Sequence, residues 1–168
     1  MVLCIVLAVL AVVLDQITKL LVVQNIAEFA SAEGIPFLFR LTYVKNTGAA
    51  FGMLADHRWV FLIFSAVAIV AILLYVWKTK PRSPWVRLAL GMILGGGIGN
   101  MIDRIRLGYV VDFIDVTFMR FAIFNVADSF VTVGCVVLFV YLIASMIQER
   151  RAGENPAVSN ENAEDGND

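Results

Sequence analysis

The chain is organised around residues 95–129, whose sequence is GGGIGNMIDRIRLGYVVDFIDVTFMRFAIFNVADS. Long apolar runs lie on both sides, yet this stretch holds four aspartates, two asparagines and three arginines. A charged side chain near the bilayer centre costs at least about 2.5–3.5 kcal/mol, so the few that occur usually face a protein interior or a wet cavity. We therefore interpret residues 95–129 as the chemical site, with two of its aspartates as the reacting pair.

The composition is that of a membrane protein. Of the 168 residues, 60% are hydrophobic and 16% are charged, whereas soluble domains are about 25% charged. About 20 apolar residues cross the hydrocarbon of a bilayer, and such segments predict helices over residues 1–23, 59–77, 85–105 and 128–147. We expect an all-α membrane protein with four transmembrane helices, forming a single integral membrane domain over residues 1–151.

The two long loops, residues 24–58 and 106–127, carry the remaining polar motifs. Strand-like composition over residues 35–44 and 109–118 predicts short strands in these loops. We therefore expect a small β-rich region on the extracytoplasmic side, formed by both loops together.

The distribution of basic residues predicts the orientation. Residues 78–87 carry four bases and no acids, and Arg150 and Arg151 follow the last apolar segment. By the positive-inside rule both regions are cytoplasmic, so both termini lie inside and both polar loops lie outside. Residues 152–168 hold five acids and no bases, which predicts a disordered acidic cytoplasmic tail.

Two helix patterns suggest how the bundle is held together. Gly91, Gly95 and Gly99 recur every four residues, which favours close packing of membrane helices. Asp15 and Lys19 are also four apart and so share a helix face. They could form an interfacial ion pair, or they could brace the site or contact lipid head groups.

Elimination of other chemistries leaves carboxylates. The sequence contains one histidine and two cysteines, without a nucleophile–base pair, a metal-ligand spacing or a phosphate-binding loop. We expect no metal, no cofactor and no nucleic-acid partner. Two carboxyls that share one proton can hydrolyse an amide. Spacing leaves open which two pair, since Asp128 could cap a helix and Asp103 could pair with Arg104 or Arg106.

A resemblance to a known family indicates which two aspartates form the reacting pair. Five motifs occur in order, and together they resemble the bacterial lipoprotein signal peptidase family (signal peptidase II), whose members have four membrane helices. The motifs are DQITK (15–19), KNTGAAFG (45–52), GGGIGNMIDR (95–104), VVDFI (110–114) and FNVADS (124–129).

The resemblance implies roles for particular residues. Asp112 and Asp128 fall on the catalytic aspartates of this family of membrane aspartic peptidases. Four residues match polar positions that support the dyad or hold the substrate backbone: Asn46, Asn100, Arg104 and Asn125. Asp15 and Lys19 match a structural polar position, whereas Asp103 and Asp115 stay outside the chemistry.

The resemblance also implies a substrate. It is a prolipoprotein whose cysteine carries a diacylglyceryl group, and the enzyme cuts on the N-terminal side of that cysteine. We expect a monomer that contacts only this substrate and membrane lipid. The small residues at positions 48–52 would permit a flap over the site.

Three other classes compete with the peptidase. A transporter or channel also places aspartates and arginines inside the membrane. An assembly protein would use the polar cluster only to lock helices together, and a divalent-metal hydrolase would need a metal. The gathering of the polar groups near one membrane face argues against a transport path.

Overall fold

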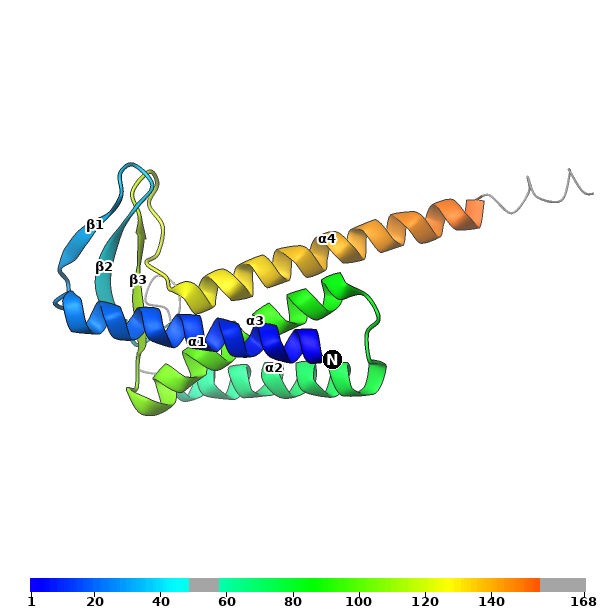
Figure 1. Cartoon of the computed structure of the whole chain (residues 1–168), viewed down its shortest axis with the longest axis horizontal. Coiled ribbons are helices and arrows are strands. Elements are labelled where there is room, and N and C mark those ends of the chain that lie inside the picture. The colour runs from blue at the N-terminus through cyan, green and yellow to red at the C-terminus, as the bar shows by residue number, and fades with distance from the viewer. Residues whose placement is uncertain (49–57, 155–168) are drawn as a thin grey trace, which may run out of the picture.

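The computed structural model describes residues 1–48 and 58–154 of the chain (Figure 1). Its long helices are α1 (Val2–Asn25), α2 (Arg58–Thr79), α3 (Pro84–Arg106) and α4 (Val126–Glu154). All four are long enough and apolar enough to cross a membrane. The predicted fold class, four transmembrane helices with a small sheet, is confirmed. Most of the predicted flap, residues 49–52, lies outside the described residues.

The helix bounds differ most from the sequence-based ones at α4. We expected this helix to end near residue 147, but it continues to Glu154. The apolar span ends before the helix does, because the Gln, Glu, Arg and Ala residues that follow are strong helix formers in water. Residues 152–154, which we assigned to the disordered tail, are therefore helical, and residues 155–168 lie outside the described part of the chain.

Helix α3 lies between α1 and α4, and glycines allow the close approach. A Cβ atom on Gly91 would lie 2.7 Å from the Cys4 carbonyl oxygen of α1. On Gly95 it would lie 2.6 Å from Ala11 Cβ, and on Gly99 it would lie 2.6 Å from Asp15 Oδ2. Each distance is too short for a real Cβ atom. The predicted packing role of these three glycines is confirmed, and the third also makes room for a buried carboxylate.

A three-stranded antiparallel sheet caps one end of the bundle. Its strands are β1 (Ser31–Ile35), β2 (Phe39–Asn46) and β3 (Val110–Val116), in the order β1-β2-β3. The strand predicted over residues 35–44 is present as β2, but it begins only at Phe39, because the chain turns after Ile35, where Pro36 cannot donate to a ladder. The strand predicted over residues 109–118 is confirmed as β3. The pairing of β2 with β3 sets Val44 opposite Asp112 and Asn46 opposite Val110.

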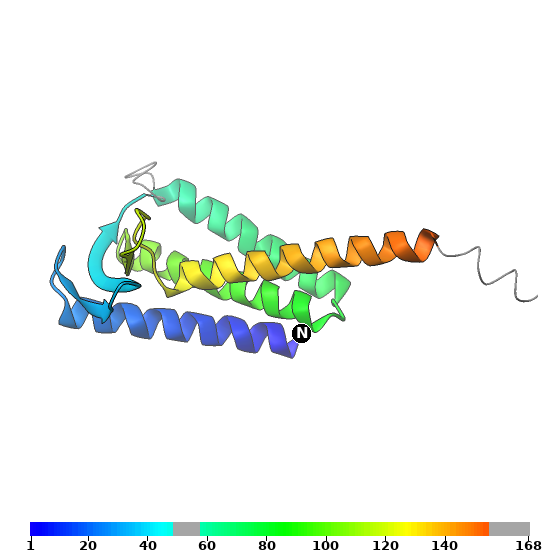
Figure 2. The ribbon, with the colours of Figure 1, turned by 90° about the horizontal axis from the view of Figure 1, so that it is seen from above.

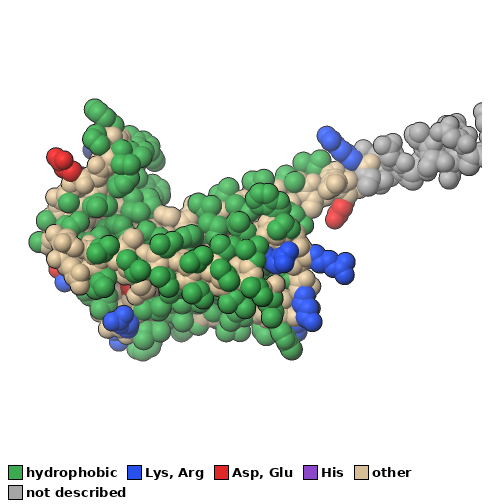
Figure 3. Space-filling model, viewed as in Figure 1, with side chains coloured by type: hydrophobic (Ala, Val, Ile, Leu, Met, Phe, Trp, Pro, Cys, Tyr) green, Lys and Arg blue, Asp and Glu red, His purple; other side chains and the backbone are tan. Residues whose placement is uncertain are grey.

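The two ends of the bundle differ in character. Figures 1 and 2 place the N-terminus and the α2–α3 connection at one end of the bundle, which we call the loop end, and the C-terminal part of α4 projects beyond this end. The sheet lies at the opposite end, the sheet end. Figure 3 shows apolar side chains covering the helices between the two ends, with lysines and arginines at the loop end and further basic side chains at the sheet end. The protein is therefore a multi-pass membrane protein.

Candidate active site

A cavity of about 580 Å³ opens at the sheet end. Its wall combines side chains from β2, α2, α3, β3 and α4 with those of the segment before α4. The lining includes Asn46, Gly48, Phe61, Asn100, Arg104, Val110, Asp112, Phe121, Ala122, Ile123, Phe124, Asp128, Ser129, Thr132 and Val133. Asp112 and Asp128, which come from different elements, thus border one space. The predicted polar residues Asn46, Asn100 and Arg104 border it as well.

Asp112 lies in the middle of β3 and is only 2% exposed. One carboxylate oxygen accepts a hydrogen bond from Asn46 Nδ2 at 2.7 Å, and the other accepts one from Asn125 Nδ2 at 2.7 Å. Burial raises the pKa of Asp112 to about 7; the Asn46 hydrogen bond opposes this rise and the negative charge of Asp128 adds to it. This carboxyl can hold a proton near neutral pH.

Asp128 and Asn125 together start helix α4. The Asn125 side-chain oxygen accepts from the Asp128 backbone N–H at 2.9 Å, and Asp128 Oδ2 accepts from the Asn125 backbone N–H at 3.2 Å. This is the reciprocal pattern of a capping box, in which two free N–H groups of the helix end are satisfied. The expectation that Asn125 or Asp128 caps the helix is confirmed for the pair. The same contacts hold both side chains at the cavity.

Two amide side chains fix the two carboxylates relative to each other. Asn125 donates to Asp112 through its side chain and to Asp128 through its backbone. Asn100 Nδ2 donates to Asp128 Oδ1 at 2.7 Å, while Asn100 Oδ1 accepts from Asn125 Nδ2 at 3.0 Å. Each aspartate therefore has a donor on both oxygens, and both are connected through one asparagine pair.

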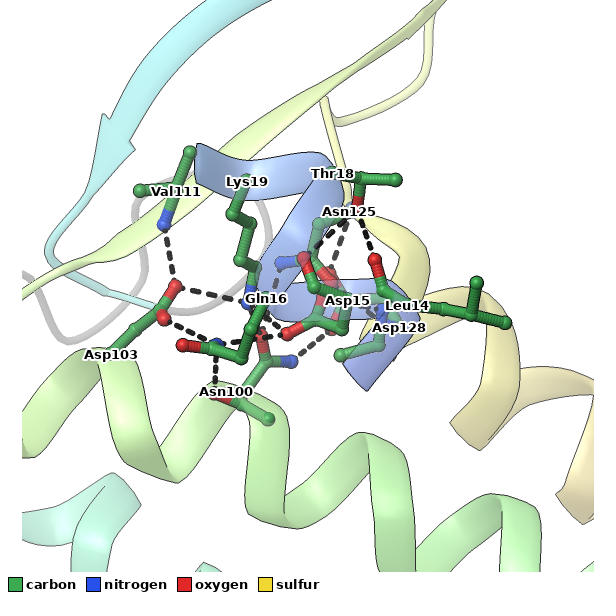
Figure 4. Close-up of polar contacts among 12 residues, drawn as sticks. Leu14, Asp15, Gln16, Thr18, Lys19, Asn100, Asp103, Val111, Asn125 and Asp128 are labelled. Atoms are coloured by element: carbon green, nitrogen blue, oxygen red, sulfur yellow. Dashed lines mark hydrogen bonds and ion pairs between the residues drawn. The ribbon is translucent and has the colours of Figure 1, made fainter. Parts of the chain in front are cut away.

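The orientation of the Asn100 amide is set by Lys19, which comes from α1 (Figure 4). The Lys19 ammonium contacts Asn100 Oδ1, Asp15 Oδ2 and Asp103 Oδ2, each at 2.9 Å. With a cation on its oxygen, the Asn100 amide can turn only its nitrogen towards Asp128. The predicted Asp15–Lys19 ion pair is present, and it is buried beside the site.

Lys19, Asp15 and Asp103 form what we call the buried cluster, which also anchors α4 and β3. Asp15 Oδ1 accepts from the backbone N–H of Ala127, in the first turn of α4, at 2.9 Å. Asp103 Oδ2 accepts from the backbone N–H of Val111, next to Asp112 on β3, at 3.1 Å. The two carboxylates thus tie α4 and β3 to the cation of α1.

The sequence analysis missed part of this cluster. We considered Arg104 or Arg106 as the partner of Asp103, but in the structure its cation is Lys19. Gln16 was not singled out, and its amide nitrogen donates to Asp103 Oδ1 at 2.9 Å. The signal was present in the DQITK motif, but Gln16 lies beside the Asp15–Lys19 face, and only the packing of α1 on α3 brings it to Asp103.

Arg104 and Asp115 face different surroundings. The Arg104 guanidinium lies 5.0 Å from the ring centroid of Phe61, on the cavity wall. Asp115 instead pairs with Arg40 Nε at 2.6 Å and accepts from Thr42 at 3.1 Å, on the sheet surface. Asp115 is thus bound elsewhere, as expected for an aspartate outside the chemistry.

The arrangement suits hydrolysis of an amide bond. Burial raises the pKa of Asp112, so this carboxyl can hold a proton beside the second carboxyl of the pair. Within residues 1–48 and 58–154, no three His, Cys, Asp or Glu side chains group as metal ligands would.

Comparison with known proteins gives consistent results. The protein family described as Signal peptidase (SPase) II matches residues 7–144. A lipoprotein signal peptidase of Symbiobacterium thermophilum is 51% identical over 144 residues, covering 84% of this chain and 94% of that protein. One from Streptococcus thermophilus is 47% identical over 136 residues, covering 80% and 89%.

Solved structures agree with the sequence comparison. A bacterial membrane enzyme determined by the in meso method at 2.3 Å is 32% identical, with a TM-score of 0.81, covering 85% of this chain and 88% of that one. A second, at 1.9 Å, is 33% identical, with a TM-score of 0.77, covering 83% and 91%.

Proposed function

The chain belongs to the signal peptidase II family, a family of proteases, and from this premise we propose that it removes the signal peptide from prolipoproteins. In this proposal it is a membrane aspartic endopeptidase that cleaves on the N-terminal side of a diacylglyceryl-modified cysteine. The relatives named lipoprotein signal peptidase support the substrate class.

One observation carries the proposed mechanism. Asp112 of β3 and Asp128 at the start of α4 border the same cavity, and Asn125 donates a hydrogen bond to each of them. No other pair of aspartates among the described residues borders this cavity. The site also lies at the end of an apolar bundle, where the scissile bond of a membrane-inserted signal peptide would emerge.

The dyad would work by general acid–base catalysis, with one proton held between its two carboxyls before the reaction. The ionised carboxylate removes a proton from a water molecule as the water oxygen attacks the scissile carbonyl carbon. The protonated carboxyl donates to the carbonyl oxygen, and a tetrahedral intermediate forms. On collapse the C–N bond breaks, the leaving nitrogen takes the proton that came from water, and a hydroxyl of the intermediate returns a proton to the dyad as the new carboxyl group forms. The raised pKa of Asp112, about 7, makes it the proposed proton carrier of the pair near neutral pH.

The remaining polar residues would support the dyad and hold the substrate backbone. Asn46, Asn100 and Asn125 donate to the aspartates and fix their positions. Arg104 lies against Phe61 and lines the cavity, where its guanidinium would bind the carbonyls of an extended peptide. Asp15 and Lys19 have the structural role of joining α1 to the site. In this proposal the enzyme acts as a monomer and uses no metal or cofactor, because its two carboxyls supply the acid–base chemistry.

Charge distribution supports the proposed orientation. The α2–α3 connection and the helix ends beside it carry Lys78, Lys80, Arg82 and Arg87, and α4 carries Arg150 and Arg151 near its end. By the positive-inside rule the loop end faces the cytoplasm. Both termini would then be cytoplasmic, and the dyad would lie near the outer face of the bacterial inner membrane.

The test is cleavage of a fluorescent lipobox peptide, with and without the diacylglyceryl group, by the purified protein in lipid. We expect wild-type protein to cut the lipidated peptide before the cysteine. Asp112→Asn and Asp128→Asn should each lose at least about 10³-fold in kcat while remaining folded, because the dyad acts as a unit. Asp115→Asn is the matched control and should keep most of the activity. Activity in Asp112→Asn together with inactivity in Asp115→Asn would overturn the assignment.

A further inference from the structure

The β1–β2 turn ends in a bulky residue where the backbone favours glycine. The Leu38 N–H donates to the Ile35 carbonyl at 3.1 Å, Pro36 follows Ile35, and Phe37 has a φ of 63°. A hydrogen-bonded turn with Pro second and a positive φ at the third residue has the features of a type II turn, which prefers Gly or Asn at that third position. A phenylalanine there is held in a conformation that aromatic side chains rarely adopt.

No packing within the described protein compensates for this backbone strain, because the Phe37 side chain is exposed. It is 93% exposed, and Leu38 beside it is 48% exposed. The backbone N–H of Thr117 donates to the Leu38 carbonyl at 3.1 Å, which brings the end of β3 to this turn. Phe118 and Met119 follow Thr117 and are 65% and 51% exposed. We call these four apolar residues, Phe37, Leu38, Phe118 and Met119, the sheet tip.

The position of the sheet tip relative to the helices indicates what covers it. Figure 1 shows the strands crossing the direction of the helices, with the β1–β2 turn and the end of β3 projecting to one side of the bundle. Figure 3 shows apolar side chains over this projecting part, on the side that faces α4. Because the helices cross the membrane, a projection of this kind lies over lipid rather than over protein.

The charges around the sheet tip also fit a lipid surface. Arg120 follows Met119 directly, so its guanidinium can reach phosphate groups while the apolar residues lie deeper, whereas the nearby Arg40 is paired with Asp115. We propose that the sheet tip inserts into the membrane interface beside the bundle and contacts phospholipid there. This contact would hold the sheet, and with it Asp112 on β3 and Asn46 on β2, at a fixed height above the membrane.

A spin label measures the depth of the sheet tip. Both native cysteines are replaced by serine, a single cysteine is placed by Phe37→Cys, and the labelled full-length protein is reconstituted into phospholipid vesicles. Glu33→Cys, on exposed β1 of the same hairpin, is the matched control. We expect the label at position 37 to collide more with oxygen, which concentrates in lipid, than with a water-soluble nickel complex. The control label should show the reverse. Equal preference for the nickel complex at both positions would overturn the proposal.

A second variant separates the lipid contact from folding. Phe37→Gly places glycine at the positive φ, so the unfolding temperature in detergent micelles should stay the same or rise. A spin label at Leu38→Cys, in protein that keeps Phe37, should have restricted motion in vesicles. When Phe37→Gly is added, the same label should become more mobile. An unchanged label mobility in vesicles would contradict a membrane contact through Phe37. This experiment does not depend on peptidase activity, so its outcome is independent of the proposed function.

Discussion

Replacing Lys19 with methionine removes the positive charge at the centre of the buried cluster and keeps a side chain of similar length. The ammonium contacts Asp15, Asp103 and Asn100, each at 2.9 Å. In the described part of the chain, its loss leaves the carboxylates of Asp15 and Asp103 without a cation in contact. The variant should therefore be much less stable than the wild type.

The expected loss of stability depends on the hydrogen-bond donors that Asp15 and Asp103 keep in the variant. Removing one partner of a buried ion pair costs about 3–5 kcal/mol. Asp15 would still accept from the Ala127 N–H and Gln16, and Asp103 would still accept from the Val111 N–H and Gln16. With these donors in place we expect the lower end, about 3 kcal/mol, or roughly a 150-fold shift in the unfolding equilibrium.

A native cysteine can be used to measure unfolding. The Cys4 thiol is 2% exposed and is packed against Val76, Val86 and Leu90, whereas Cys135 is exposed. In a Cys135→Ser background, the rate at which a thiol reagent modifies Cys4 in detergent micelles measures the unfolded fraction.

The control is the same substitution at an exposed ion pair. Lys45 contacts Glu28 at 2.6 Å, with both side chains partly exposed, and pairs of this kind contribute about 0–1 kcal/mol. Lys19→Met should unfold far more readily than Lys45→Met. Equal stability of the two variants would refute the reasoning that the buried cluster is a single charge-balanced unit.

Three further predictions concern packing, capping and titration. Gly95→Leu should destabilise the protein by about 1–3 kcal/mol or more, because even a Cβ at this position would lie 2.6 Å from Ala11 Cβ. Gly97→Ala, where the nearest atom is 3.8 Å away, should be neutral or stabilising in the same unfolding assay. Asn125→Ala should lose about 1 kcal/mol of stability with the helix cap; Asn125→Ser should recover the cap, yet both variants should lose kcat because the donor to Asp112 is gone. A folded-state pKa of about 7 for Asp112 means that only the unfolded state is ionised between about pH 4 and pH 7. The free energy of unfolding should therefore fall as pH rises through this interval, and Asp112→Asn should show a smaller fall.

The spans could be predicted from sequence because crossing a membrane requires long apolar segments. Residues 59–77 lie within α2 (Arg58–Thr79), and the spacing of Gly91, Gly95 and Gly99 indicated the packing face of α3. The end of α4 could not be placed, because the helix continues in water after its hydropathy falls. Hydropathy reports where the membrane ends, and helix propensity decides where the helix ends.

The candidate site was predictable only in part. The spacing of Asp15 and Lys19 predicted their contact, since residues four apart share a helix face. The contact of Lys19 with Asn100, 81 residues away, depends on how α1 rotates and seats on the glycines of α3. No local pattern encodes that rotation, which is why the true partner of Asp103 was missed. The choice of Asp112 and Asp128 came from the resemblance to a family, and their roles remain predictions.

The most direct test of the proposed dyad is an infrared titration of its carboxyl groups. The wild-type protein in lipid should show a protonated carboxyl band at mildly acidic pH that disappears as pH passes about 7. The band should be absent from Asp112→Asn and retained in Asp115→Asn. A band that persists in Asp112→Asn, or a wild-type protein whose carboxyls are all ionised at mildly acidic pH, would contradict the account.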